Sequence, residues 1–528
     1  IGGVPLRPPM PAADAPPFAR SRRRGAAVML AGGYANLLLL TVQGLVLVPV
    51  YLRYLGAETY GAWMASGDLL GWLAVLDLGI AGISAQRMAA AHGRGDARGV
   101  GEYFGTGLVV QAALVALLTA LAVLAAPWVP GWVRLTGPAA AELSACFAVA
   151  GLATGLGLLG NLVGALALGT QRMVFVNLAV FLSGVVGIVA TLVLLVAKWG
   201  LWALALGMLA RGGVMLLAVG GHAIYVLRQD LRVRARVRWR VVKDFAALSP
   251  ITVLTMVGNA AAARSDAVLI ALFYGPRTVT VYVLTRRAAD MLSLFLARIG
   301  AAVHPGFAHL VGGGDHARAA IVLSQVWRVY LWSAVPSVAL YVALNRTFVS
   351  LWVGPGQFAG QTVTLLVGLN VLLVGWAALV TYLLGAAGQI ARAGMAVFVE
   401  AALRILLALV LLRAMGLPGL PLAAVPTAAV AAYVALGWLY GGLGARLPRV
   451  SLRDALSAAA LLAIGAAAGT VRWADSWAGF VGWGLAFGCV AAAAVLALEP
   501  LARGLARRGL ARALRRRHPA RAQARAHR

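Results

Sequence analysis

The chain has 528 residues, of which 62% are hydrophobic and 12% are charged, whereas about 25% of the residues of a soluble domain are charged. Its mean hydropathy is +0.88, which indicates a polytopic helical membrane protein and excludes an ordinary soluble domain. The formal net charge of +29 would suggest nucleic-acid binding in a soluble chain. Here the basic residues lie mainly in tails and loops, as the positive-inside rule predicts, so we expect no nucleic-acid partner.

The first part of the chain predicts a basic tail and six membrane helices. Residues 1–24 are rich in Pro, Ala and Arg, and we expect them to be disordered. The apolar run that follows is too long for a signal-peptide core and has no obvious cleavage site. It is therefore expected to remain as a membrane helix with a cytoplasmic N-terminus. Further helices, near 60–91, 100–126, 140–170, 173–197 and 199–227, complete an N-lobe over residues 25–227.

Residues 228–244 form the strongest internal break. They carry five arginines at a spacing of two, namely Arg232, Arg234, Arg236, Arg238 and Arg240. A helix would distribute these side chains all round its surface, whereas an extended segment places them on one face. We expect a cytoplasmic linker that lies on anionic phospholipid headgroups, with Trp239 towards the lipid. A plain solvated loop explains the same pattern equally well.

The second part of the chain predicts another lobe, an extra helix pair and a basic tail. The apolar runs lie near 245–274, 278–310, 317–344, 360–387, 391–414 and 420–445, which form a C-lobe over residues 245–446. Two more runs, near 452–471 and 477–499, form an extra pair over residues 447–500, and a basic cytoplasmic tail covers residues 501–528. The expected fold is therefore all-α with about 14 transmembrane helices, an even number that leaves both termini cytoplasmic.

Two runs in the C-lobe carry charges that a lipid-facing position would not tolerate. These residues are Arg264, Asp266, Arg286, Arg287, Asp290 and Arg298. An Arg at the bilayer centre costs about 2.5–3.5 kcal/mol, so they must line a wet cavity or pair with one another. At about 100° per residue, the last four share one side of the second run. On the first run, Asn259 and Asp266 share a face and Arg264 points nearly opposite.

This pattern favours a positively charged cavity at the midplane of a transporter. Arg264, Arg286, Arg287 and Arg298 are the candidate substrate contacts. Asp266 and Asp290 are candidates for coupling to an ion or for orienting the arginines. An ion-pair network that only holds helices together is the alternative.

The two lobes match each other at one constant offset. The matched pairs are Gly56 with Gly275, Gly95 with Gly314, Asp96 with Asp315, Gly169 with Gly388, and Gly200 with Gly419, and each pair differs by 219 positions. Each repeat spans six helices, so both halves share one membrane orientation and form a parallel repeat. A cavity between two such lobes suits alternating access.

The repeat also separates two carboxylates on the second apolar run. Subtracting 219 from the number of Arg287 gives Asp68. If Arg287 faces the cavity, Asp68 should face it from the other lobe. Asp77 points about 180° away from Asp68 on a helix. We therefore predict that Asp68 functions in ion coupling or in orienting the arginines, and that Asp77 is structural.

Five parts of the sequence look familiar, namely Tyr51–Gly61, Leu76–Ile80, Gly93–Asp96, Asp266 with the following Leu269, Ile270, Tyr274 and Gly275, and Leu351–Gly354. They resemble segments of the polysaccharide-biosynthesis flippases, the O-antigen and exopolysaccharide translocases of the multidrug/oligosaccharidyl-lipid/polysaccharide exporter superfamily. The resemblance covers residues 27–446. It implies a flippase of the bacterial inner membrane that moves an undecaprenyl-diphosphate-linked oligosaccharide to the periplasmic leaflet. It also implies that the arginines contact the diphosphate or acidic sugars, and that a polysaccharide polymerase and a chain-length regulator are partners.

The sequence also allows other functional interpretations. A multidrug antiporter of the same superfamily would need carboxylates and aromatic rings for organic cations, and the excess of arginines argues against it. A lipid II-type flippase is a further alternative, because related flippases also have two extra helices. A membrane glycosyltransferase, polymerase or ligase would need catalytic carboxylates or a large extramembrane domain. We therefore expect no enzyme activity and no cofactor. We also expect no metal site, because the histidines are scattered. No phosphate-binding GxxxxGK[ST] loop occurs, which argues against ATP hydrolysis.

Overall fold

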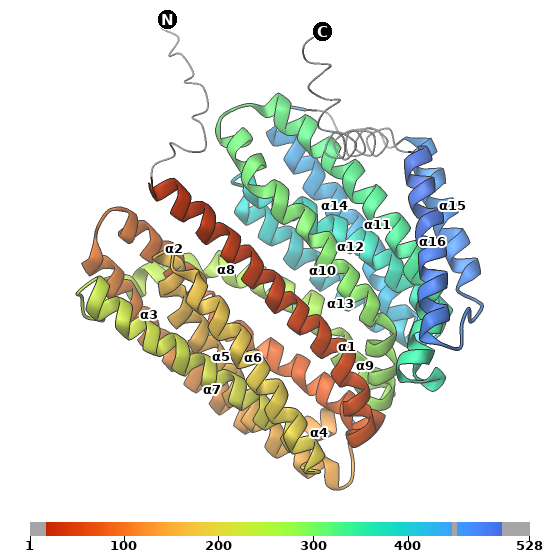
Figure 1. The fold of residues 1–528 in the computed structure, drawn as a ribbon, viewed down its shortest axis with the longest axis horizontal. Coiled ribbons are helices and arrows are strands. Elements are labelled where there is room, and N and C mark those ends of the chain that lie inside the picture. Colours follow the sequence, from red (N-terminus) through yellow and green to blue (C-terminus); the bar gives the residue numbers. More distant parts are fainter. Residues whose placement is uncertain (1–16, 446–450, 499–528) are drawn as a thin grey trace, which may run out of the picture. The chain divides into compact units, whose positions relative to one another are not determined.

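The computed structural model describes residues 17–445 and 451–498, and within these ranges it contains helices and no strands (Figure 1). In the described ranges, 11 helices are long and apolar enough to cross a membrane. The number rises to 12 if Trp239–Pro250 and Thr252–Arg264, which are bent by 48°, form one span. The expected all-α polytopic membrane architecture is confirmed.

Two features explain why this number is lower than the expected number of about 14. The stretch Thr41–Gly93 has 53 residues and is counted once, although about 20 residues suffice to cross a bilayer. The helix α15, Leu452–Ala468, has 17 residues, which is the short limit of a membrane-spanning helix.

The chain divides into two compact units, and the first contains Ile1–Met256 together with Tyr274–Arg277. The boundary falls inside α8, Trp239–Arg264. The helix α1 begins at Pro17, inside the stretch expected to be disordered, whereas residues 1–16 lie outside the described ranges. The other helices of this unit are η1 (Ala74–Asp77), α2 (Ile80–Gly93), α3 (Ala97–Ala125), α4 (Val129–Trp132), α5 (Pro138–Gly169), α6 (Met173–Val196), α7 (Trp202–Tyr225) and η2 (Val226–Asp230).

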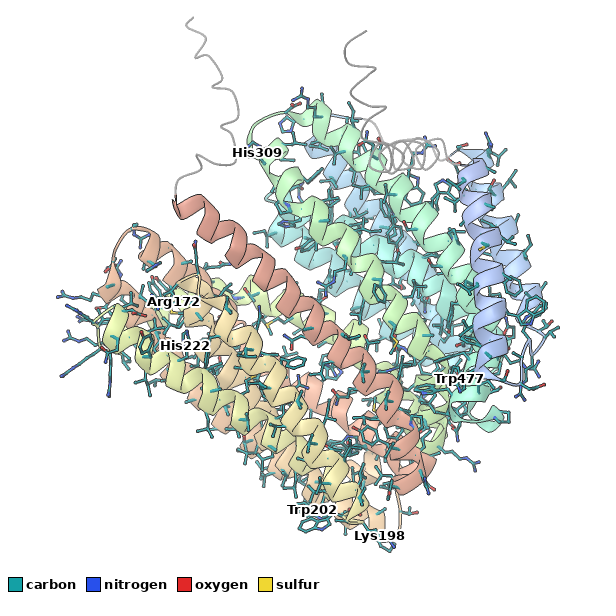
Figure 2. All side chains as sticks on the ribbon, viewed as in Figure 1. Arg172, Lys198, Trp202, His222, His309 and Trp477 are labelled. Carbon is teal, nitrogen blue, oxygen red and sulfur yellow. The ribbon has the colours of Figure 1, made fainter. Side chains whose placement is uncertain are left out.

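The first unit is organised around α5, which packs against α7, α3 and α2, while α6 packs against α7. Small residues allow the close approach: a Cβ added at Gly151 would lie 2.4 Å from the Cβ of Ala122, as is typical of helix pairs in membranes. Figure 2 shows Arg172 and His222 at one end of this unit and Lys198 and Trp202 at the opposite end, so α6 and α7 run its full length.

The basic segment before α8 is not helical over residues 232–238, as the spacing of its arginines predicted. It lies against α3, because the amide of Arg236 donates to the carbonyl of Gly101 at 3.2 Å and the amide of Arg238 donates to Thr106 Oγ1 at 2.9 Å. All five of its arginines are exposed, and Trp239 is also exposed.

The second compact unit contains Val257–Phe273 and the chain from Thr278 onwards. In its core α12 and α13 both pack against α14, and α15 and α16 pack against α11 at one edge of the unit (Figure 1). The expected tail, residues 501–528, lies outside the described ranges. The helices are α9 (Asp266–Tyr274), α10 (Pro276–Gly312, which begins at the end of the first unit), α11 (His316–Val353), η3 (Pro355–Gln357), α12 (Gln361–Ala386), α13 (Ile390–Met415), α14 (Gly419–Gly442), α15 and α16 (Trp477–Leu498).

The first half of the repeat recurs in the backbone at the predicted offset. Gly56 and Gly275 both have a positive φ, of 77° and 81°, where a helix bends or begins. Asp96 is the N-cap of α3 and Asp315 is the N-cap of α11, and each carboxylate accepts the amide three residues later, at 2.8 Å and 3.2 Å. A capping carboxylate satisfies an otherwise unpaired amide at the helix start. These two positions are therefore structurally equivalent.

The second half of the repeat follows a slightly different offset. Gly388 has a positive φ of 83°, but its predicted partner Gly169 is still helical, and the positive φ of the first unit occurs at Gln171. The repeat also breaks at Ala74–Gly79, where the first unit leaves the helical conformation. The equivalent residues of the second unit lie inside the unbroken helix α10.

Candidate functional site

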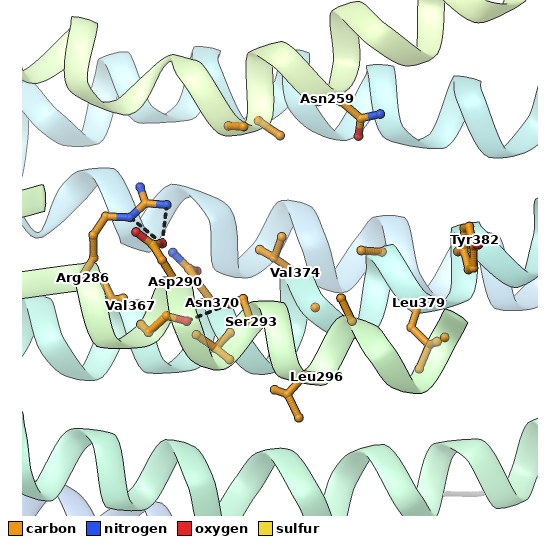
Figure 3. Close-up of a pocket in the computed structure, with 18 of the residues that line it drawn as sticks. Asn259, Arg286, Asp290, Ser293, Leu296, Val367, Asn370, Val374, Leu379 and Tyr382 are labelled. Carbon is orange, nitrogen blue, oxygen red and sulfur yellow. Dashed lines mark hydrogen bonds and ion pairs between the residues drawn. The ribbon is translucent and has the colours of Figure 1, made fainter. Parts of the chain in front are cut away.

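A cavity of about 650 Å³ lies inside the second unit, among its membrane-spanning helices. Its walls come from α8 to α13 and combine apolar surface with a few polar side chains. Figure 3 shows Arg286 and Asp290 joined to each other, with Asn370 beside them and Tyr382 at the far end of the cavity. The polar groups that line it are Asn259, Asp266, Tyr282, Arg286, Asp290, Ser293, Tyr330, Asn370, Tyr382 and Arg404.

Asp266 is the centre of the polar wall. Arg404 Nη2 donates to both of its carboxylate oxygens, at 2.8 Å and 3.1 Å, and Arg286 Nη1 donates to Oδ2 at 2.7 Å. The hydroxyl of Tyr282 donates to the same oxygen at 3.3 Å. The side chains of Asp266 and Arg404 are 7% and 10% exposed, so this ion pair is buried.

Arg286 connects the buried ion pair to the cavity. Its Nε donates to Asp290 Oδ1 at 3.0 Å, and Nη2 lies 3.0 Å from the same oxygen. Its guanidinium also lies 5.6 Å from the centre of the Tyr282 ring, within range of a cation–π interaction. The side chains of Arg286 and Asp290 are 27% and 40% exposed. The Asp266–Arg404 pair is therefore buried, whereas the Arg286–Asp290 pair is accessible to a ligand.

The network contains two arginines and two aspartates, so its formal charges cancel. The sequence predicted a cavity with an excess of positive charge, and this cavity does not have one. Its inner half, Asp266 with Arg404, matches the alternative of an ion pair that holds helices together. The two residues come from α9 and α13, which the pair fixes to each other.

The structure brings together some of the predicted site residues. Arg286, Asp266 and Asp290 line the cavity, and Asn259 joins Asp266 there, as their shared helical face predicted. Arg264 and Arg298 are exposed and do not line this cavity, and neither does the half-buried Arg287. The lining positions of α10 follow the helical repeat, at 282, 286, 289, 290, 293, 296, 297, 300 and 301. This face is centred away from Arg287 and Arg298 by part of a helical turn.

The two carboxylates of the first unit also have different surroundings. Asp68 is half-buried on α1. Asp77 is 8% exposed, and Gln111 Nε2 donates to its Oδ1 at 2.6 Å.

Arg404, which donates two hydrogen bonds to Asp266, is not among the site residues predicted from the sequence. The sequence contains a feature that could have identified Arg404, because Arg404 and Glu400 lie four residues apart within an apolar run, where each charge is costly. Glu400 is also buried and accepts a hydrogen bond from Thr427 Oγ1 at 3.3 Å. In the described ranges, no group of three or more His, Cys, Asp or Glu side chains could hold a metal ion.

Comparisons with known proteins agree with the resemblance of the sequence. The model of a family described as "Polysaccharide biosynthesis protein" matches residues 103–356, just under half of the chain. No curated protein matches the chain.

Solved structures of two kinds resemble the fold. A lipid II flippase, MurJ, in an inward closed conformation has a TM-score of 0.64 at 12% identity, covering 92% of this chain and 99% of that one. An inward-facing multidrug-resistance MATE family transporter of the MOP superfamily has a TM-score of 0.61 at 15% identity, covering 78% of this chain and 94% of that one. The Vibrio cholerae MATE transporter VcmN, in its bent form, has a TM-score of 0.55 at 13% identity, with 80% and 98% covered.

The family suspected from the sequence is therefore supported by a family model and by the fold. The chain is a multi-pass membrane protein whose fold is similar to those of a lipid II flippase and of a MATE family transporter of the MOP superfamily. The similar proteins are transporters and a flippase rather than enzymes.

Proposed function

We propose that this protein is a flippase that moves an undecaprenyl-diphosphate-linked oligosaccharide from the cytoplasmic to the periplasmic leaflet of a bacterial inner membrane. Both termini would lie in the cytoplasm, because basic residues are concentrated in the terminal segments and such segments stay on the cytoplasmic side. The family model and the transporter fold support this proposal. The partner proteins named by the resemblance, a polymerase and a chain-length regulator, are part of the same proposal.

The observation that carries the proposal is the guanidinium of Arg286 inside a cavity of membrane-spanning helices. A guanidinium binds phosphate through two parallel hydrogen bonds. In the structure, two of its nitrogens meet Asp290, the more exposed partner, while Nη1 meets the buried Asp266. An incoming phosphate would displace Asp290 from Nε and Nη2 and would leave the bond to Asp266 in place. Asp290 would thus occupy Nε and Nη2 of Arg286 until the phosphate binds, and Asp266 with Arg404 would orient the Arg286 side chain.

The other predicted arginines extend this proposal. Arg287 is half-buried, and its Nε has no hydrogen-bond partner within the described ranges. A buried donor without a partner is costly, so it favours a ligand that accepts from it. Arg264 and Arg298 are exposed at other positions of α8 and α10. We propose that these three meet the headgroup at another stage of transport, outside the cavity described here.

One observation favours a second candidate, a multidrug antiporter. The cavity contains the partly exposed carboxylate of Asp290 and the rings of Tyr282, Tyr330 and Tyr382. Carboxylates and aromatic rings are the groups that bind organic cations. Arg286 weighs against this candidate, because it neutralises Asp290 at 3.0 Å.

Export of cell-surface polysaccharide by Arg286→Ala tests the leading proposal. We expect the variant to reach the membrane at normal abundance and to lose export at least tenfold, because the phosphate loses its two hydrogen bonds. Arg286→Lys should restore export only in part, since it keeps the charge without the planar fork. Arg277→Ala is the matched control, because Arg277 is an exposed arginine at the start of the same helix.

Normal export by Arg286→Ala would refute the proposal. Drug resistance that falls in Arg286→Ala or Asp290→Asn while polysaccharide export stays normal would favour the antiporter instead.

A further inference from the structure

The break between α1 and α2 interrupts a stretch that is long and apolar enough to cross the membrane. Ala74–Asp77 form a 3₁₀ turn, and Leu78 and Gly79 then both adopt the left-handed conformation, with φ of 52° and 72°. A leucine is strained in this conformation, and such strain is common at functional sites. Non-helical backbone within a membrane persists only where protein or a cavity surrounds it. The equivalent part of the second unit has no such break, so the fold does not require it.

Asp77 lies in this break, and its surroundings lack a compensating positive charge. Its side chain meets Gln111 Nε2 at 2.6 Å and the backbone amide of Gly79. Among the described residues it has no ion-pair partner. Gln111 is fully buried, and its Oε1 has no hydrogen-bond partner there. A buried acceptor therefore lies next to a buried carboxylate and is not used.

Among the described residues, no basic side chain on the helices packed against the break forms an ion pair with Asp77. These helices are α1, α3 and α5, and Thr252 of α8 contacts Gly79, where an added Cβ would lie 2.3 Å from Thr252 Cγ2. The charged residues described on them are Arg53, Glu58, Asp68, Arg98, Glu102, Glu142, Arg240, Lys243, Asp244 and Arg264. Glu102 pairs with Arg238, and Glu142 accepts the amide of Leu201. An ionised carboxylate without a positive partner is costly inside a membrane unless it takes up a proton or a cation.

We propose that Asp77 and Gln111 form a proton-binding site in the first unit. In the ionised form, Gln111 Nε2 donates to the carboxylate, as in the structure. When Asp77 takes a proton from water, its new hydroxyl donates to Gln111 Oε1 after the amide turns over, and the proton later returns to water. One amide can thus stabilise both forms. A proton is favoured over a metal cation because the structure offers one free acceptor atom on Gln111 rather than a set of several oxygens.

The position of the site connects it to conformational change. Protonation removes the charge that the amide of Gly79 stabilises, and Gly79 lies directly against α8. The charge state of Asp77 therefore biases the geometry of the break. Asp77 thus takes the coupling role that the repeat predicted for Asp68. The proton site itself is independent of the transported substrate, whereas its coupling to transport rests on the proposed function.

Infrared difference spectroscopy of the full-length protein in lipid nanodiscs tests the site directly. Lowering the pH should produce the carbonyl-stretch band of a buried, protonated carboxyl group, which is separated in frequency from the bands of the exposed carboxyl groups. We expect this band to be absent from Asp77→Asn and present in the matched control Asp68→Asn. A band that persists in Asp77→Asn, or disappears only in Asp68→Asn, would overturn the inference. Loss of the band when sodium replaces potassium would show a metal-cation site and would overturn it as well.

Gln111→Leu keeps the test valid if Asp77→Asn does not fold. It retains the carboxyl group and removes its hydrogen-bond partner, so the band should move to a higher frequency. An unshifted band would contradict the role of Gln111.

Transport in vesicles then separates the two proposals. Wild-type transport should depend on a pH gradient at least tenfold more strongly than transport by Asp77→Asn. An infrared band without any movement of lipid-linked oligosaccharide would refute the proposed function and support the proton site. Transport that depends on pH equally in both proteins would refute the coupling.

Discussion

Asp266→Asn should destabilise the protein far more than Asp290→Asn, although both changes remove one carboxylate charge from the same network. Asp266 is 7% exposed and accepts three hydrogen bonds from two arginines. Its loss leaves Arg404, which is 10% exposed, as a buried charge without its partner, and such a loss costs about 3–5 kcal/mol. Asp290 is 40% exposed, and a pair of this kind contributes about 0–1 kcal/mol.

The free energy of unfolding in mixed micelles, followed by tryptophan fluorescence, measures this difference. The double variant Asp266→Asn with Arg404→Met removes both buried charges, so it should be more stable than Asp266→Asn alone. A double-mutant cycle gives the interaction energy, which we expect to be at least about 1 kcal/mol in favour of the pair. Equal stability of Asp266→Asn and Asp290→Asn would refute the division of the network into a buried and an exposed half.

Two further substitutions test the packing of segments around the lobes. Gly465→Val should detach α15 from α11 and lower the thermal stability, because an added Cβ would lie 2.6 Å from the carbonyl oxygen of Ala339, whereas Gly482→Val, with no atom within 4 Å, should have little effect. Equal stability of the two variants would contradict the packing of this pair. Gly105→Val should increase trypsin cleavage within residues 232–240, because its Cβ would lie 2.6 Å from the amide nitrogen of Arg236. If the segment is cytoplasmic, cleavage should occur in inverted vesicles only, and cleavage in right-side-out vesicles would contradict that orientation.

The sequence predicted the helices well because each apolar run of membrane-spanning length must satisfy its own backbone hydrogen bonds. It also predicted that Asp266 and Asn259 share a face, since that relation depends only on the helical repeat. It did not predict the pairing of Asp266 with Arg404, because these residues are 138 positions apart and nothing local connects them. The direction of Arg287 depends in the same way on how α10 is rotated within its unit.

The sequence did not predict the break at Ala74–Gly79, for a different reason. Leu78 is a residue that avoids a positive φ, so its left-handed conformation has no local sequence signal. Gly79 offered a weak signal, and the tight contact with Thr252 shows why a glycine stands there. The offset of 219 positions does not hold at the ends of α5 and α12 for a similar reason, since Gln171 rather than Gly169 adopts the left-handed conformation.

The measurement that tests the central claim most directly is the movement of a fluorescent undecaprenyl-diphosphate-linked oligosaccharide across vesicles that contain only the purified protein. An impermeant quencher reports the fraction of label in the outer leaflet. We expect wild-type protein and Arg277→Ala to expose the whole label to the quencher, and Arg286→Ala to leave half of it protected, as in protein-free vesicles. Protection of half of the label by the wild-type protein, or full exposure by Arg286→Ala, would contradict a flippase that works through the Arg286 cavity.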